Sequence, residues 1–251
     1  MTAPAAPGFD DALRVVADVA GWMTDDQARR LWDRAAAVPP RGRIVEIGSY
    51  HGRSAIVLAR AAPGGAEVVA IDPHAGNDRG PQEIRGSADE GERDHQAFLA
   101  NLERAGVRDR IRHVRAGSEL AGPEVPGPID LLYIDGAHRY RPARDDIRAW
   151  GARVADGGTL LIHDSFCSVG VTGAILTELL ASRSLRYVDR VGSLAEYRRE
   201  PTRGADRWRS AGRQLAQLPW FLKSVLVKVL LTLRLRPLTR LLGHRSGEWP
   251  Y

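Results

Sequence analysis

Two pairs of ionisable side chains follow short apolar runs and have the types and spacing for metal or acid–base chemistry. Asp135 and His138 lie three residues apart after one run, and His163 and Asp164 close another. In a parallel sheet the carboxyl ends of both strands face one crevice, so Asp135 and Asp164 could share a cation. Such oxygen ligands suit Mg²⁺, which needs few carboxylates and keeps several waters. The alternatives are helix capping or turn formation for the aspartates, and strand-end packing rather than nitrogen ligation for His163.

His138 is the candidate general base. An imidazole has a pKa near the working pH, so it can take the proton of an acceptor hydroxyl. A metal bound to the acceptor oxygens would stabilise the alkoxide and hold it in place. The alternative is a surface histidine in the turn before the next helix. Tyr140, Arg144 and Trp150 follow and could reach an acceptor, although a place on the helix surface or in the core is favoured for them.

A glycine-containing turn near residue 50 indicates a binding loop. The apolar run Ile44–Ile47 includes Glu46, enters a turn with Gly48 and Gly52, and opens a helix at Ser54. In an open α/β sheet this turn lies where the crevice for a nucleotide-like ligand forms, and glycine lets the backbone approach closely. Glu46 would repel a pyrophosphate but suits the ammonium of an amino-acid moiety, which favours S-adenosylmethionine (SAM). The alternative is an ordinary strand-to-helix turn.

Other parts of such a site follow in order. Asp72 ends a second apolar run about 20 residues beyond the loop, where a carboxylate can take a ribose diol. Its alternative is an aspartate that only starts the next turn. A third run leads into residues 116–119, where Ser118 could face the adenine. The residues expected to bind SAM are Glu46, Gly48, Ser49, Tyr50, Gly52, Ser54, Asp72, Ser118 and Asp135.

Short apolar runs alternate with helical stretches and predict the fold. The expected strands are 44–47, 67–72, 111–114, 129–135 and 159–164. This alternation predicts an α/β, Rossmann-like, doubly wound and mostly parallel sheet, with an N-terminal helical cap and a basic C-terminal helical tail. Three parts are expected: a cap over residues 1–40, a SAM-binding domain over 41–200, and a helical appendage over 201–251.

Two segments outside the sheet have specific expectations. The main helix of the cap begins at Thr24, and Gln27 three residues later completes a capping box. The polar segment Gly76–His95 is rich in both charge signs, so it is either a mobile lid over the site or a plain surface loop.

The charge of the chain is concentrated in its tail. Residues 201–251 hold ten basic and two acidic residues, a net charge of +8, whereas the remaining 26 basic and 29 acidic residues give −3. The apolar stretch Leu218–Leu235 contains three basic residues, which disfavours a membrane span. It could lie on an anionic membrane surface, or pack on the domain or on a second subunit. Nucleic-acid binding is not expected, because few aromatic residues interleave with the charge.

Compartment signals are few. The single cysteine, Cys167, excludes an internal disulfide and fits a reducing compartment. Residues 1–10 lack the basic and apolar regions of a signal peptide. The expected location is cytoplasmic, with peripheral membrane contact as an option.

The motifs resemble those of a known family. The segments 45–54, 71–73, 134–140 and 157–164 look like class I SAM-dependent methyltransferases, and specifically the branch with macrocin-type and mycinamicin-type sugar O-methyltransferases and cephalosporin hydroxylase-like proteins. The resemblance implies that Asp135 binds Mg²⁺ and that His138 is the base. It also implies an acidic pair at the fifth strand, where this chain has His163 and Asp164, so the first acid is replaced.

The expected function is therefore a SAM-dependent, Mg²⁺-assisted O-methyltransferase acting on a hydroxyl of a sugar, in a glycosylated natural product or a polysaccharide. One alternative is methylation of a catechol or phenol, which the small number of aromatic residues mildly disfavours. Another is a protein of the same fold that binds SAM or a partner without catalysis. The partner in the first case is a small-molecule or saccharide acceptor.

Overall fold

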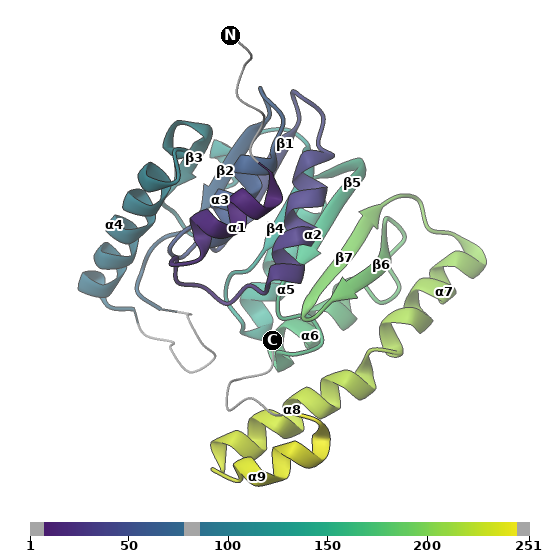
Figure 1. Ribbon diagram of the computed structural model, residues 1–251. Helices are drawn as coiled ribbons and strands as arrows, with labels where there is room; N and C mark the ends of the chain where they lie inside the picture. The colour runs from purple at the N-terminus through teal and green to yellow at the C-terminus, as the bar shows by residue number, and fades with distance from the viewer. Residues whose placement is uncertain (1–7, 78–85, 245–251) are drawn as a thin grey trace.

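A seven-stranded sheet forms the centre of the protein (Figure 1). The computed structural model describes residues 8–77 and 86–244. The strand order is β3-β2-β1-β4-β5-β7-β6, with β1 to β5 parallel and with β7 antiparallel to β5 and to β6. The predicted α/β, Rossmann-like and mostly parallel sheet is confirmed. The strands are β1 Arg43–Ile47, β2 Glu67–Ile71, β3 Ile111–Val114, β4 Ile129–Ile134, β5 Val154–Ile162, β6 Leu185–Val191 and β7 Leu194–Arg199.

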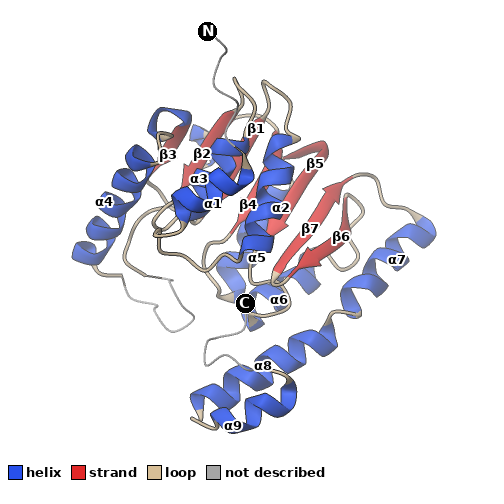
Figure 2. Ribbon diagram, viewed as in Figure 1, coloured by secondary structure: helices blue, strands red, loops and turns tan. Residues whose placement is uncertain are grey.

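Helices cover both faces of the sheet (Figure 2). Successive strand residues point to opposite faces, so Ile44 enters one core while Val45 and Ile47 enter the other. The central strands are apolar on both faces, as expected for a covered parallel sheet. The first core contains α1 Phe9–Val16, α2 Asp25–Ala36, α3 Arg53–Ala61 and α4 Ala88–Arg104, and the second contains α5 Tyr140–Gly151 and α6 Val169–Glu178.

Two strand features differ from the sequence-based expectation. β5 begins at Val154 rather than at residue 159, because pairing with β4 continues across the glycines 157 and 158 through a register shift. The hairpin of β6 and β7 was not predicted. Its two-residue turn, Gly192 and Ser193, is a recognised hairpin signal between two strand-like runs.

The helix caps explain two boundaries. Thr24 Oγ1 accepts from the Gln27 N–H at 3.3 Å, and Gln27 Oε1 accepts from the Thr24 N–H at 2.9 Å, so the predicted capping box is confirmed. Ser87 caps α4, which begins at Ala88. The loop expected over residues 76–95 is therefore wrong for residues 88–95, which are helical. Residues 78–85 of that segment lie outside the described residues.

The last part of the chain forms three α-helices. They are α7 Gly204–Leu215, α8 Leu218–Thr232 and the short α9 Arg236–Thr239, followed by a 3-10 turn at Arg240–Leu242. α9 folds back beside α8 (Figure 1). The stretch Gly204–Thr232 is long and apolar enough to cross a membrane by length and composition alone, and 11% of its 18-residue apolar window is buried.

Candidate active site

One cavity of about 960 Å³ lies at the carboxyl ends of β1, β2, β4 and β5. Its size is in the range of small-molecule sites. Most of the residues that the sequence singles out for chemistry line it: Gly48, Ser49, Tyr50, Ser54, Asp72, Ser118, Asp135, His138, His163 and Asp164. Glu46 and Gly52 are not among the residues that line this cavity. The structure thus brings together side chains from four strand ends, as parallel strands require.

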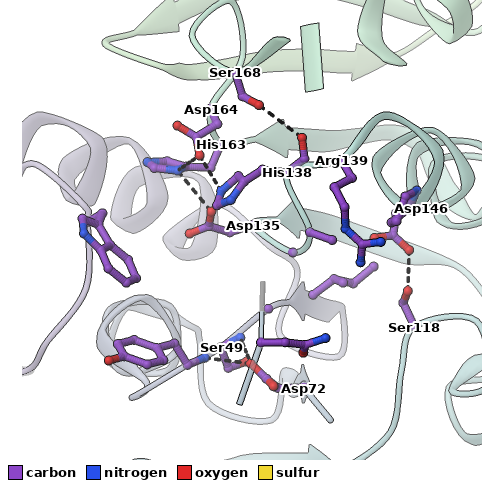
Figure 3. Close-up of a pocket in the computed structure, with 18 of the residues that line it drawn as sticks. Ser49, Asp72, Ser118, Asp135, His138, Arg139, Asp146, His163, Asp164 and Ser168 are labelled. Carbon is purple, nitrogen blue, oxygen red and sulfur yellow. Dashed lines mark hydrogen bonds and ion pairs between the residues drawn. The ribbon is translucent and has the colours of Figure 1, made fainter. Parts of the chain in front are cut away.

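Asp72 holds the loop between β1 and α3. Its Oδ2 accepts the backbone N–H groups of Ser49 and Tyr50 at 2.7 and 2.8 Å, and its Oδ1 accepts the N–H of His74 at 2.7 Å. Figure 3 shows the Asp72 carboxylate beside Ser49 at the cavity. The carboxylate therefore fixes the loop conformation, and its predicted contact with a ribose remains a prediction.

The two loop glycines are needed for contacts within the protein. Gly48 has φ +85°, and a Cβ there would lie 2.2 Å from the Asp135 carbonyl oxygen. Gly52 has φ +86° and caps α3, and a Cβ there would come within 3.1 Å of the Phe98 ring. Gly48 thus lets the loop touch the end of β4, which brings Asp135 close to the loop. Their predicted contacts with the ligand remain predictions.

Glu46 lies beneath the loop. It is fully buried, and its Oε2 accepts the Ser49 hydroxyl at 2.7 Å. Burial raises the pKa of Glu46 to about 8, although the hydroxyls of Ser54 and Ser49 lower it. Its Oε1 has no hydrogen-bond partner within the described part of the chain. For the predicted pairing to form, the SAM ammonium must therefore reach this oxygen from the cavity.

Ser118 lines the cavity but is tied to the protein. Its hydroxyl donates to the carboxylate of Asp146, and its carbonyl accepts from the Trp150 indole at 3.2 Å. Burial raises the pKa of Asp146 to about 6, against the hydrogen bond from Ser118. Asp146 also lines the cavity and was missed by the sequence-based prediction. The expected contact of Ser118 with adenine stays a prediction.

Four side chains form the reactive cluster (Figure 3). His138 Nε2 lies 2.5 Å from Asp164 Oδ2, and His163 Nδ1 lies 3.1 Å from Asp135 Oδ1 and 3.8 Å from Asp164 Oδ2. The Tyr133 hydroxyl donates to Asp135 Oδ2 at 2.8 Å. Two carboxylates and two imidazoles from β4 and β5 therefore meet at one point of the cavity wall.

Mutual charge sets the protonation of this cluster. Burial would lower the pKa of His163, but Asp135 and Asp164 outweigh it and raise that pKa to about 9. Burial would likewise lower the pKa of His138, yet its bond to Asp164 and the nearby Asp135 raise it. Burial would raise the pKa of Asp164, but the two histidines hold it far below its usual range. Each buried charge is thus paired.

Gln27 lies beside the second ring nitrogen of His163, Nε2. His163 Nε2 lies 3.4 Å from Gln27 Oε1, an oxygen oriented by the Thr24 N–H, while Gln27 Nε2 donates to Ser193 at 3.1 Å. Nδ1 of His163 lies near Asp135 but makes no hydrogen bond within the described residues. The raised pKa of His163 favours the charged ring, and ligation of a metal by His163 remains a prediction.

The remaining donors fit a divalent cation. Asp135, His138 and Asp164 each offer one ligand atom, and these atoms lie within 4.8 Å of one another. Two carboxylates are sufficient for Mg²⁺, which keeps several waters. The structure thus groups both predicted aspartates with His138. His163 lies beside them, and its predicted role as a metal ligand remains a prediction.

Backbone strain marks the same cavity. Within residues 8–77 and 86–244, five non-glycine residues have positive φ, and three of them, Tyr50, His74 and Asp164, line the cavity. Such strain persists only where surrounding contacts fix it, and it gathers at functional sites. Trp22 also lines the cavity and stacks on Tyr50 with ring centroids 5.4 Å apart. No sequence signal marked Trp22 or His74, because both lie outside the recognised motifs.

The side chains that the sequence considered for acceptor contact, Tyr140, Arg144 and Trp150, do not line the cavity. The Tyr140 hydroxyl donates to Thr177 at 3.4 Å, and Arg144 pairs with Asp145. Trp150 is buried and donates to Ser118. They take the places on the helix surface and in the core that the sequence favours.

Comparison with known proteins agrees with the geometry. Residues 45–165 match a family described as a methyltransferase domain. Catechol O-methyltransferase of Mycobacterium tuberculosis is 29% identical over 147 residues, which are 57% of this chain and 56% of that protein. The chain thus spans little more than half the length of this curated relative.

Solved structures share the fold. Cofactor-bound Rv0187 from MTB has a TM-score of 0.53 at 22% identity, covering 77% of this chain and 89% of that chain. TomG from Streptomyces achromogenes, an O-methyltransferase solved with SAM, has a TM-score of 0.53 at 20% identity, covering 79% and 91%. The sheet order, the loop after β1 and the strand-end cavity define the class I SAM-dependent methyltransferase fold. Residues 45–165, just under half of the chain, are similar to a methyltransferase domain, in agreement with this fold.

Proposed function

We propose that this protein is a SAM-dependent O-methyltransferase that methylates a hydroxyl of a sugar, in a glycosylated natural product or a polysaccharide. One observation carries the proposal: His138 and Asp164 form a 2.5 Å pair beside Asp135 in the cavity that the SAM-type loop borders. An imidazole oriented by a carboxylate is suited to take a proton from a weakly acidic hydroxyl.

The reaction balances with these residues. The acceptor oxygen forms a bond to the methyl carbon of the substrate SAM, and the carbon–sulfur bond breaks with its electron pair going to sulfur. The hydroxyl proton goes to His138. Nε2 of this ring faces Asp164, and Nδ1 is buried without a hydrogen-bond partner among the described residues, so we propose that the bound acceptor hydroxyl supplies that partner and gives its proton to Nδ1. Asp164 then stabilises the imidazolium and keeps the ring oriented, as a carboxylate does in related dyads.

Asp135 and Asp164 would hold Mg²⁺. When bound, the cation supplies Lewis-acid stabilisation of the developing negative charge on the acceptor. Tyr133 orients the Asp135 carboxylate, and His163 balances its charge from the protein side. In this proposal the two aspartates hold the cation whether or not His163 binds it. The presence of a histidine at the place of the first acid is therefore compatible with the site.

The cavity wall supports a saccharide acceptor. The exposed Trp22 indole there stacks on Tyr50, whose ring also stacks on His51, so Trp22 is the aromatic ring suited to the apolar face of a sugar ring. Polar side chains, among them Arg53, Asn77 and Asp94, line the same cavity and can pair with sugar hydroxyls. TomG is described as involved in tomaymycin synthesis, which supports a natural-product acceptor by analogy.

A catechol or phenol is the second candidate acceptor. The name of the relative from Mycobacterium tuberculosis favours it. The Trp22 ring could also stack on an aromatic acceptor. The two classes are separated by offering a catechol and a glycoside in parallel under the same conditions.

The test uses methyl-labelled SAM and a fractionated extract of the source organism, with and without a chelator. Label in one fraction that chelation abolishes supports metal-assisted methyl transfer and delivers the acceptor for identification. Labelling that is unchanged by the chelator would support methyl transfer but contradict a metal site at Asp135 and Asp164. SAM binding by calorimetry without any transfer, across all fractions, would favour a non-catalytic binding protein.

A matched pair of variants ties the result to the site. His138→Asn should abolish transfer, whereas His244→Asn, a histidine outside the cavity lining, should retain it. Both variants should bind SAM, because neither residue belongs to the loop between β1 and α3. Equal activity of the two variants would contradict the role of His138.

A further inference from the structure

α8 exposes a row of large apolar side chains. Leu222, Leu226, Val229 and Leu233 are 64%, 46%, 46% and 61% exposed. Their spacing of four, three and four residues puts them on one side of the helix. The exposed leucines Leu235, Leu238 and Leu241 follow them beyond α8. We call these seven side chains together the leucine stripe. A gathering of exposed apolar side chains of this size on neighbouring helices is typical of an interaction site.

The charge around the leucine stripe has one sign. Between residues 207 and 247 the sequence has nine basic and no acidic residues. The basic residues exposed on α8 and after it include Lys223, Arg234, Arg236 and Arg240. An apolar stripe with basic edges is complementary to an anionic lipid surface. A second copy of this chain would bring the same positive charge, and a nucleic acid would leave the leucines uncovered.

A side of α8 that adjoins the leucine stripe contributes to the cavity. Val225 and Lys228 line it, and Lys228 Nζ donates to the Cys167 carbonyl, three residues after Asp164, at 3.2 Å. Ser224 and Val227 are buried on the same helix. A surface touching the leucine stripe would thus lie within about one helix diameter, roughly 10 Å, of the cavity wall.

We propose that α8 and the segment after it dock on an anionic membrane through the leucine stripe, and that the acceptor is the sugar of a lipid-linked saccharide in that membrane. The second clause rests on the proposed methyltransferase function. The helix would lie on the surface rather than cross it. α8 alone has 15 residues, which span about 22 Å against a hydrocarbon core of about 30 Å, so a crossing would need α7 as well, and α7 contains Arg207, Arg209 and Arg213. Insertion would also pull Ser224 and Lys228 from their contacts.

The first test measures binding to lipid vesicles by co-sedimentation. The full-length protein should bind vesicles containing phosphatidylglycerol, bind pure phosphatidylcholine vesicles more weakly, and lose binding as salt rises. The triple variant Leu222→Gln, Leu226→Gln, Leu233→Gln should bind about tenfold less or weaker still. Leu120→Gln, an exposed leucine outside the tail, is the control and should bind like the wild type.

A second pair separates charge from apolar contact. Arg236→Gln with Arg240→Gln should reduce binding to anionic vesicles and leave the weaker binding to neutral vesicles unchanged. Arg41→Gln with Arg104→Gln, two exposed arginines outside the tail, should change neither. All variants should keep the wild-type melting temperature and SAM affinity, since the substituted side chains are exposed.

Three outcomes would overturn the docking proposal. The protein could stay in the supernatant with anionic vesicles at low salt. It could be a dimer in sedimentation velocity that the leucine variant dissociates, or it could bind a nucleic-acid oligomer equally well with and without the leucines. Vesicle binding needs no acceptor, so it is independent of the methyltransferase assay.

The acceptor is tested with membranes of the source organism and labelled SAM. Label should enter the lipid extract with the wild type and not with the leucine variant, while both proteins methylate the same water-soluble acceptor. Transfer to the water-soluble acceptor alone would contradict the proposal of a lipid-linked acceptor, while the proposed methyltransferase function would stand. If neither the lipid extract nor the water-soluble acceptor is methylated while the protein still binds vesicles, both the lipid-linked acceptor and the methyltransferase function would be contradicted. The proposal that α8 docks on a membrane would stand.

Discussion

The imidazole of His138 and the carboxylate of Asp164 meet at 2.5 Å between Nε2 and Oδ2, across the ends of two neighbouring strands. His138 comes from the loop after β4, and Asp164 lies two residues beyond β5. Asp164 has φ +55°, a conformation that few residues other than glycine, asparagine and aspartate adopt readily. The pairing is therefore built into the backbone and gives the base a fixed orientation.

Replacing Asp164 tests this relationship directly. Asn tolerates the same backbone conformation, so Asp164→Asn should fold but lose the charge that orients and stabilises the His138 imidazolium. The rate of methyl transfer should fall by about 10²–10⁴-fold. SAM affinity by calorimetry should change little, because Asp164 contacts the two histidines rather than the loop after β1. Asp145→Asn, on the exposed side of α5, serves as control and should keep full activity.

Asp72 should matter for affinity rather than for chemistry. Asp72→Ala leaves the N–H groups of Ser49, Tyr50 and His74 without their acceptor, and each lost buried hydrogen bond costs about 1–3 kcal/mol. The loop should loosen, so SAM should bind about 10–100-fold more weakly in calorimetry. Asp33→Ala on the exposed side of α2 is the control. Unchanged SAM affinity of Asp72→Ala would show that the loop does not need this clamp.

The sequence could predict the placement of side chains that directly follow the strands of the sheet. Asp72, Asp135 and Asp164 follow apolar runs, and parallel pairing places their ends at one edge whatever the loops do. The surroundings of His163 could not be predicted, because its neighbour Gln27 lies 136 residues away in the sequence and no motif indicates that contact. The burial of Glu46 was also hidden, since the motif reads the same whether its carboxylate faces the cavity or lies beneath the loop.

Gly48 should be replaceable only at a high cost to folding. A Cβ at this position would lie 2.2 Å from the Asp135 carbonyl oxygen, and φ is +85°. Gly48→Ala should therefore destabilise the protein by about 2 kcal/mol or more in denaturant unfolding. Any folded fraction should lose methyl transfer, because Asp135 must move. Gly64→Ala is a matched control, since no atom lies within 4 Å of its Cβ position and its φ is not in the left-handed range. A similar loss in both variants would contradict this reading.

Asp146 predicts a pH-dependent difference in stability. Its pKa is about 6 in the folded protein against 3.8 for an ordinary aspartate, because burial penalises the charged form. The folded state therefore binds this proton more tightly than the unfolded state. Its contribution to stability is fully present below pH 3.8 and is lost as the pH rises through 6.

Asp146→Asn keeps an acceptor for the Ser118 hydroxyl but cannot ionise. Relative to the wild type, it should be more stable at pH 8 than at pH 4 by about 1–3 kcal/mol in unfolding measured without SAM. The shift should occur between pH 4 and 7, the range in which Asp146 titrates in one state and not in the other. A stability difference that is the same at both ends of this range would mean that Asp146 is not buried as a costly charge. The hydrogen bond from Ser118 would then be the main role of this side chain.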